Sequence, residues 1–157
     1  TAATFQTAMY ASVVERFAQG VTVLEDPCIG LVDQIENGNL DGAQTRSILK
    51  TALRPMVAAG VDTIVMGCTH YPFVIPLIQE IVGPEVRVID PAPAIARQTR
   101  RMLEAHDLLI TSRRKAAVRY ITSGDPRAFR RALRQLLQLD RHVQKVAWQD
   151  GRIVSGS

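Results

Sequence analysis

The sequence contains only two cysteines, Cys28 and Cys68, among 157 residues. This scarcity excludes a small scaffold held together by several disulfide bonds, and it favours a reducing compartment. No run of about 18 apolar residues is present, so the sequence predicts no membrane-spanning helix. No basic segment followed by an apolar run opens the chain, so no signal peptide is predicted either. We therefore expect a cytoplasmic protein.

Aromatic residues make up only 5% of the sequence, whereas hydrophobic residues as a whole make up 46%. A hydrophobic content this high excludes an intrinsically disordered chain and is sufficient for a packed core. We find no internal repeat and no low-complexity segment, and both absences argue against a repeat protein or a flexible linker. The composition is that of an ordinary globular protein.

Charge is distributed unevenly along the chain. Residues 1–90 contain 5 Lys or Arg and 10 Asp or Glu, net −5, and residues 91–157 contain 14 and 5, net +9. The change indicates two structural units. A basic second part also allows a nucleic-acid-binding surface, for which Arg130, Arg131 and Arg134 are the candidates. Their helical spacing beside apolar residues favours a solvated helix face instead.

Segments with helical periodicity alternate with short β-branched runs. This alternation, at intervals of 25 to 35 residues, predicts an α/β fold with a mainly parallel sheet and helices on both faces. The predicted strands are residues 21–24, 61–66, 86–90, 117–122 and 143–148. The predicted helices are residues 4–19, 29–36, 43–59, the segment that follows Pro72, residues 91–105, and a segment that ends near Gln138.

In such folds, ligands bind beyond the carboxyl ends of the strands. Three strand ends carry polar or reactive residues: Asp26-Pro27-Cys28, Gly67-Cys68-Thr69-His70 and Asp90-Pro91. Cys68 is the most informative, because it follows a buried strand and precedes a helix whose positive end favours a thiolate. His70, two residues further on, can exchange a proton at neutral pH. The alternative is that Cys68 is a small buried hydrophobic residue, and for Cys28 we expect such a structural role.

Gly67-Cys68-Thr69-His70-Tyr71-Pro72 resembles the second catalytic-cysteine motif of glutamate racemases. Further segments extend the resemblance over nearly the whole chain. They are Thr1-Ala2-Ala3-Thr4, which resembles the family's Thr-x-x-Thr loop, and residues 31–38, 88–91 and 122–126. The resemblance implies a cofactor-independent enzyme without a metal that interconverts L- and D-glutamate and supplies D-glutamate for peptidoglycan.

The resemblance also implies a role for each matching residue. Cys68 corresponds to the base that removes the Cα proton of L-glutamate. His70 corresponds to the histidine that assists this cysteine or the substrate amine, and Glu36 to the acidic residue that positions the histidine. Thr69 corresponds to a substrate contact. Thr1 and Thr4 correspond to the loop that lines the substrate pocket.

The turn that carries the family's other catalytic cysteine has no counterpart in the sequence. The chain also opens without an initiator Met, and the strand expected before Thr1 is absent. We therefore expect the C-terminal part of a glutamate racemase, with half of the active site and no activity by itself. Residues 1–96 are expected to form most of the second domain, and residues 97–157 to return and complete the first.

Two other functions stay open at this point. The first is another racemase of the same superfamily, which acts on aspartate or a related acid. The second is a non-catalytic binding module that uses the basic half of the chain. The family resemblance further implies a small-molecule substrate, no membrane partner, and a homodimer as a possible assembly.

Overall fold

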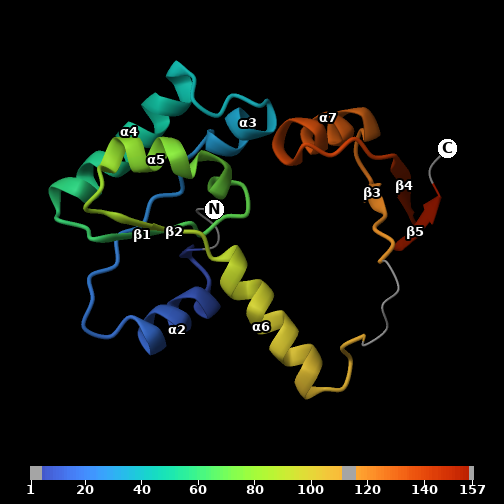
Figure 1. The fold of residues 1–157 in the computed structure, drawn as a ribbon, viewed down its shortest axis with the longest axis horizontal. Coiled ribbons are helices and arrows are strands. Elements are labelled where there is room, and N and C mark those ends of the chain that lie inside the picture. The colour runs from blue at the N-terminus through green and yellow to red at the C-terminus, as the bar shows by residue number, and fades with distance from the viewer. Residues whose placement is uncertain (1–4, 111–115, 156–157) are drawn as a thin grey trace. The chain divides into compact units, whose positions relative to one another are not determined.

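The computed structural model describes residues 5–110 and 116–155 (Figure 1). The chain divides into two compact units, residues 1–96 (unit 1) and residues 97–157 (unit 2), and each is described by itself. Within the described residues, no helix combines the length and the apolar character needed to cross a membrane.

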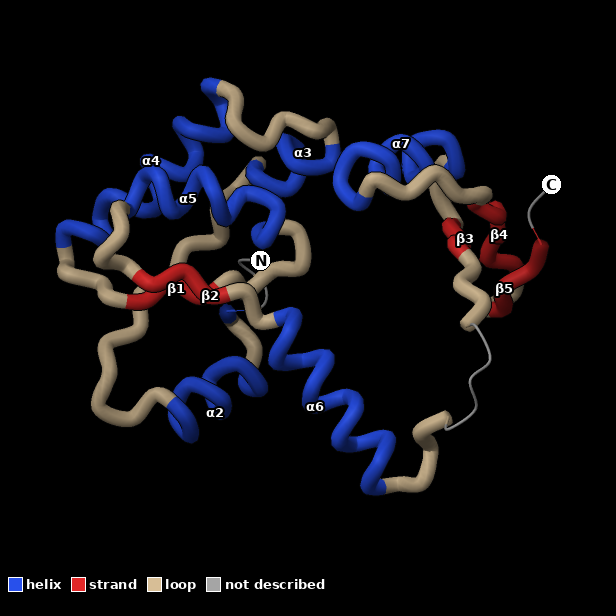
Figure 2. Tube along the Cα trace, in the orientation of Figure 1, coloured by secondary structure: helices blue, strands red, loops and turns tan. Residues whose placement is uncertain are grey.

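Unit 1 contains a pair of parallel strands with helices around it (Figures 1 and 2). Strand β1 pairs with β2 so that Thr63 lies opposite Arg87 and Val65 opposite Ile89. In Figure 1, α4 and α5 lie on one side of these strands and α2 on the other. The elements are α2 (Ala8–Phe17), α3 (Leu31–Glu36), α4 (Ala43–Ala58), β1 (Thr63–Val65), the 3-10 turn η1 (Tyr71–Val74), α5 (Ile75–Val82) and β2 (Arg87–Ile89).

Helix α4 shows how the sequence pattern of unit 1 becomes its core. Its buried residues Thr45, Leu49, Ala52 and Leu53 recur at three- and four-residue spacings, so they form one face of the helix. The other buried apolar side chains of unit 1 come from α3, η1, α5 and the strand region: Leu31, Ile35, Ile64, Met66, Val74, Leu77, Ile78, Val82 and Val86. Thr45, the buried polar residue, donates its hydroxyl to the Asn39 carbonyl at 2.6 Å.

The strand predicted at residues 21–24 is wrong. This segment has no regular secondary structure, and Val21, Val23 and Leu24 are 42–65% exposed. A strand needs a neighbour that accepts and donates its backbone hydrogen bonds, and none of the described residues supplies one here. The β-branched composition of the segment therefore does not by itself produce a strand.

Unit 2 contains a three-stranded mixed sheet with one helix packed against it. Strand β3 (Tyr120–Thr122) pairs in parallel with β4 (Val143–Gln149), and β4 pairs antiparallel with β5 (Arg152–Ser155). Helix α7 (Pro126–Leu137) begins at Asp125, whose carboxylate accepts hydrogen bonds from the Arg127 and Ala128 amides. Helix α6 (Ala92–Ala105) runs across the division between the units.

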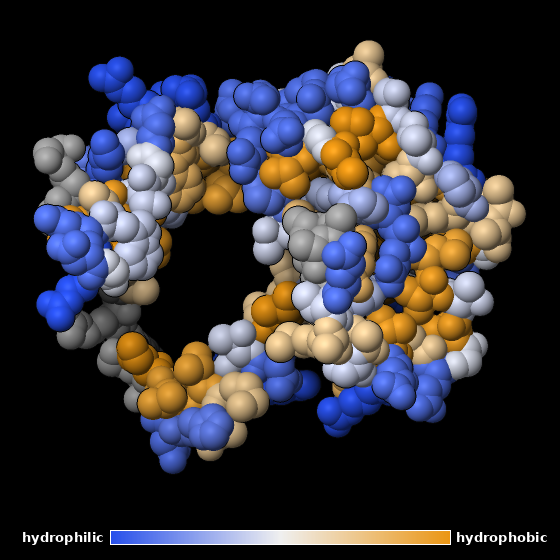
Figure 3. All heavy atoms as spheres, turned by 180° about the vertical axis from the view of Figure 1, so that it is seen from behind, coloured by the Kyte–Doolittle hydropathy of each residue, from blue (hydrophilic) through white to orange (hydrophobic). Residues whose placement is uncertain are grey.

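The sheet of unit 2 is covered on one face. Tyr120 lies opposite Val143, and its ring meets that of Phe129 on α7 edge to face, at 6.5 Å between centroids. Because side chains alternate along strands, Ile121, Trp148 and Ile153 lie on the face away from α7, where they are 43–67% exposed. Figure 3 shows hydrophobic side chains at the surface of the molecule.

The predicted α/β class with parallel strands is confirmed, and the helices and strands occur close to the predicted segments, apart from residues 21–24. Strand β5 was not predicted. It folds back along β4 through Asp150 and Gly151, which both have left-handed backbone angles, with φ of 50° and 73°. A type I′ hairpin turn requires two such residues, and Asp-Gly is a favoured pair for it.

Candidate active site

Cys68 lies directly beyond the end of the β1–β2 pair. The pairing extends one residue past β1, since the Met66 amide donates to the Ile89 carbonyl at 3.0 Å. The chain then turns through residues 67–70 into η1, where Pro72 stands in the first turn. Cys68 is a free, half-buried thiol in this turn. The sequence predicted a reactive group at this strand end, and the half-buried Cys68 lies there.

The structure brings Cys68, His70 and Glu36 together in a row. The Cys68 Sγ lies 3.9 Å from the His70 Nδ1, at the long end of a hydrogen bond to sulfur. On the other side of the ring, the His70 Nε2 lies 3.1 Å from the Glu36 Oε1. The His70 and Glu36 side chains are 33% and 58% exposed. We call this row of three side chains the relay.

The contact with Glu36 favours one tautomer of the neutral His70 ring. An ionised carboxylate can only accept hydrogen bonds, so a contact with Glu36 requires the proton on the His70 Nε2. In the neutral ring, the Nδ1 then presents its lone pair to the Cys68 thiol. This arrangement can receive a proton from sulfur and leave a thiolate.

Cys28 differs from Cys68 in its surroundings. The pKa of the Cys28 thiol is raised to about 12, mainly by burial, and the nearby Asp26 carboxylate and the Cys68 sulfur contribute to this rise. Its backbone is left-handed, with φ 44°, and its amide donates to the Asp26 Oδ1 at 2.7 Å. Cys28 therefore holds its proton at neutral pH, which agrees with the structural role expected for it.

The remaining predicted site residues are placed as follows. Thr69 is exposed in the same turn as Cys68. Thr1 and Thr4 lie outside the described residues, so their predicted role stays a prediction. Within the described part of the chain, no three His, Cys, Asp or Glu side chains are grouped so that they could hold a metal ion.

Sequence reasoning missed the contact made by Tyr71. Its hydroxyl donates to the Pro27 carbonyl at 2.7 Å and so links two segments 44 residues apart. The pKa of Tyr71 is raised to about 12, mainly by burial, and the charges of Cys28, Cys68 and Asp26 contribute to this rise. A half-buried tyrosine needs a partner for its hydroxyl, but the identity of that partner depends on the fold.

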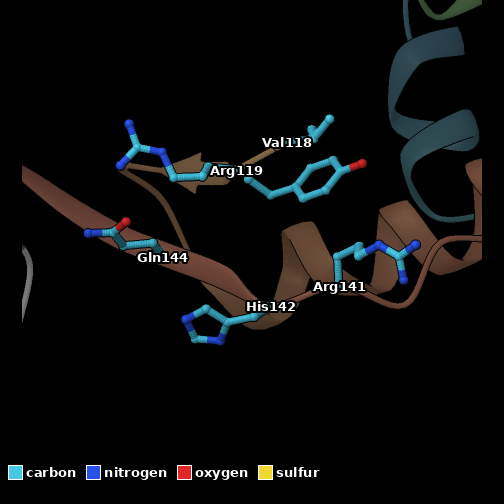
Figure 4. A pocket seen from close by; sticks show the side chains of 6 residues that line it. Val118, Arg119, Arg141, His142 and Gln144 are labelled. Carbon is cyan, nitrogen blue, oxygen red and sulfur yellow. The ribbon is translucent and has the colours of Figure 1, made fainter. Parts of the chain in front are cut away.

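A pocket in unit 2 carries a different set of residues (Figure 4). Its volume is about 270 Å³, and it is lined by Val118, Arg119, Tyr120, Arg141, His142 and Gln144. The side chains of Arg119 and Gln144 point to one side in this view and the guanidinium of Arg141 to the other. Of these side chains, all but Tyr120 are exposed, so the pocket is an open depression.

Of the three arginines considered for nucleic-acid binding, Arg130 forms an ion pair with Asp140 at 2.7 Å. This pair raises the pKa of Arg130 and lowers that of Asp140, mainly through their hydrogen bond. One of the three charges is thus already partly neutralised on the protein's own surface. The observation favours the solvated helix face.

Comparison with known proteins identifies the family. A family model described as Asp/Glu/Hydantoin racemase matches residues 1–99. The chain belongs to this family. The matched residues include the whole relay, and the resemblance to glutamate racemases found in the sequence is confirmed.

Individual racemases extend the similarity beyond the matched residues. The chain is 44% identical over 147 residues to a glutamate racemase of Pseudomonas putida. The aligned region covers 94% of this chain and 55% of that protein. A crystal structure of a glutamate racemase isoform from Bacillus anthracis matches with a TM-score of 0.81 and 25% identity, over 94% of this chain and 55% of its own.

A glutamate racemase from Francisella tularensis in complex with D-glutamate matches with a TM-score of 0.76 and 26% identity, over 88% of this chain and 52% of its own. The chain therefore spans about half the length of the racemases that it matches.

Proposed function

We propose that this chain supplies one half of a glutamate racemase active site, with Cys68 as the acid or base on one face of the substrate Cα. The observation that supports this proposal is the relay, because it joins a thiol, an imidazole and a carboxylate in one row at a strand end. The similarity to glutamate racemases favours glutamate as the substrate.

The proposed proton transfers follow from the relay's geometry. Glu36 holds the proton on the His70 Nε2, so the Nδ1 takes the proton from the Cys68 thiol. The resulting thiolate removes the substrate's Cα proton, and the electron pair of that C–H bond stays on the substrate as a carbanion. In the reverse direction, the Cys68 thiol returns a proton to the same face. Thr69, which is exposed beside Cys68, is proposed to contact the substrate.

Inversion of the substrate needs an acid on the opposite face, which one thiol cannot supply. We propose that this acid is the second cysteine implied by the resemblance, on a segment that this chain does not span. Residues 1–96 would then form most of one racemase domain, and residues 97–157 would complete the other. Thr1 and Thr4 would line the substrate pocket.

The role in peptidoglycan synthesis, the cytoplasmic location, a homodimer and the independence from cofactors belong to the same proposal. They rest on the resemblance to glutamate racemases. The rival substrate is aspartate, since the family that matches the chain includes racemases of aspartate as well as of glutamate.

Proton NMR in D₂O tests directly whether this chain carries one half of the active site. The signal of the glutamate Cα hydrogen is followed for L- and D-glutamate with this chain, and with the chain fused to the preceding half of the Pseudomonas putida racemase. We expect inversion only with the fused polypeptide, and Cys68→Ser should abolish it. Cys28→Ser is the matched control and should retain it.

Two outcomes would contradict the proposal. Inversion by the 157-residue chain alone would show that an opposing acid lies within it. Full activity of the Cys68→Ser fusion would remove Cys68 from the reaction. Faster exchange of aspartate than of glutamate would favour the rival substrate.

A further inference from the structure

Two contacts join the same pair of segments in unit 1. The first segment, residues 26–36, contains Cys28 and α3, and the second, residues 68–74, contains Cys68 and η1. The Tyr71 hydroxyl donates to the Pro27 carbonyl near the start of the first segment, and His70 contacts Glu36 at its end. The position of Glu36 is therefore fixed relative to the turn that carries Cys68.

Helix α3 is too short to fix its own position. It has six residues, and its first residue follows Gly30, which offers no side chain to cap the helix. A helix of this length has little stability by itself, so its contacts hold it in place. Leu31 and Ile35 anchor one face of α3 in the core, whereas the Glu36 side chain is 58% exposed and has His70 as its partner.

The Tyr71 hydroxyl is suited to a permanent contact. Tyr71 is half-buried, and the raised pKa of its hydroxyl keeps the proton in place throughout the neutral range. Its acceptor is a proline carbonyl in the turn that Asp26 closes by accepting the Cys28 amide at 2.7 Å. The partner of Tyr71 thus belongs to a turn with its own internal hydrogen bond.

We propose that Tyr71 is a positioning residue, whose hydroxyl clamps residues 26–36 to the Cys68 turn and thereby keeps Glu36 within reach of His70. In this role it takes no part in the proton transfers. It acts through Glu36, because the orientation of α3 decides whether the carboxylate meets the His70 Nε2. The inference rests on the proposed function of the relay.

The test uses the 157-residue chain with Tyr71→Phe, which removes the hydroxyl and keeps the ring. Two quantities are measured: the rate at which iodoacetamide alkylates Cys68 at pH 7, followed by peptide mass spectrometry, and the tautomer of His70, read from its imidazole ¹⁵N chemical shifts. We expect the alkylation rate to fall roughly threefold, the effect of one lost hydrogen bond, and a mixture of His70 tautomers to replace the Nε2–H form.

The direction of the change in alkylation rate distinguishes a positioning role of Tyr71 from a role in fold stability alone. If Tyr71 only stabilised the fold, its loss would open the Cys68 turn and alkylation would become faster. An unchanged or increased rate with an unchanged His70 tautomer would overturn the proposal. Tyr120→Phe in unit 2 is the matched control, since it removes the same atom from a residue outside the two joined segments, and it should change neither quantity.

Glu36→Leu distinguishes a failure of the clamp from a failure of the relay, because leucine has a similar size and no acceptor for the His70 Nε2–H. If Glu36→Leu leaves the alkylation rate and the His70 tautomer unchanged, the relay itself is refuted. If Glu36→Leu lowers the rate and Tyr71→Phe does not, only the clamp is refuted. When both lower it, Tyr71→Phe should add nothing in the Glu36→Leu background, because the two act through one contact.

Discussion

The two units differ in how completely they bury their apolar side chains. In unit 1, α3, α4, η1, α5 and the strand region contribute a dozen buried apolar residues to one core. In unit 2, the described residues that are buried and apolar are Leu133 and Val143, and α7 covers one face of the sheet. The other face leaves Trp148 and Ile153 more than half exposed.

This difference shows that regular secondary structure and a sufficient core are separate requirements. Unit 2 has a well-capped helix and paired strands, but none of its described residues covers the second face of its sheet. A sheet with an apolar face needs a second layer to bury it. The uncovered face supports our proposal that residues 97–157 complete a domain whose remainder this chain does not span.

The largest expected difference between the units is in amide hydrogen exchange. We expect amides in α4, α5 and β1 to exchange on the order of 100-fold more slowly than those in α7 and β3, because opening unit 1 exposes its core. Exchange measured by NMR on the whole chain at low concentration would test this. Equal protection in both units of a monomer would contradict the comparison.

A core truncation in unit 1 should have the next largest effect. Leu49→Ala in α4 should lower the free energy of unfolding by about 2–5 kcal/mol, since Leu49 is only 1% exposed and its loss leaves a cavity. Urea unfolding followed by circular dichroism measures it. Val57→Ala in the same helix is the control: Val57 is 41% exposed, and the change should stay within about 0.5 kcal/mol.

Alkaline pH should destabilise unit 1 first. The folded protein holds the Cys28 and Tyr71 protons up to a pKa of about 12, whereas the ordinary values are 9.0 and 10.0. The unfolded chain therefore loses these protons earlier, and stability falls as the pH rises from about 9 towards 12. Unfolding midpoints should show a shallower fall in Cys28→Ser. A midpoint that does not change between pH 9 and 11 would refute this prediction.

The smallest effect is expected on the uncovered face of unit 2. Trp148→Gln should change the free energy of unfolding by less than about 0.5 kcal/mol, because Trp148 is already 67% exposed. Trp148 is the only tryptophan, so its emission reports on this face. In the fused polypeptide of the activity test, the emission should shift to shorter wavelength, and an unshifted emission would show that this face stays in water.

Local patterns in the sequence were enough to predict most of the fold. The periodicity of α4 and the β-branched run of β1 each determine their structure within a few residues. The segment at residues 21–24 has a strand-like composition, but a strand depends on a partner elsewhere. The pair Asp150-Gly151 is a local signal for a hairpin turn, so the return of β5 along β4 is predictable from the sequence.

Less of the candidate site than of the fold could be predicted from local patterns in the sequence. The placement of Cys68 and His70 in one turn follows from the motif itself, whereas Glu36 was paired with His70 only through the family resemblance. The contact between Tyr71 and Pro27 could not be predicted, because it joins residues 44 positions apart and one partner is a backbone carbonyl. Every residue type has a backbone carbonyl, so the sequence does not indicate which one accepts this hydrogen bond.

The tight turn between β4 and β5 has a consequence for the order of folding. The two strands are neighbours in sequence, so their hairpin can close within about 1–10 μs, before pairings across longer loops. β1 and β2 are separated by η1 and α5. Closing this longer loop costs more chain entropy than closing the β4–β5 turn, and the cost comes before the strands make any contact. The β4–β5 hairpin can therefore form before the β1–β2 pairing, although unit 2 has the smaller core to stabilise it.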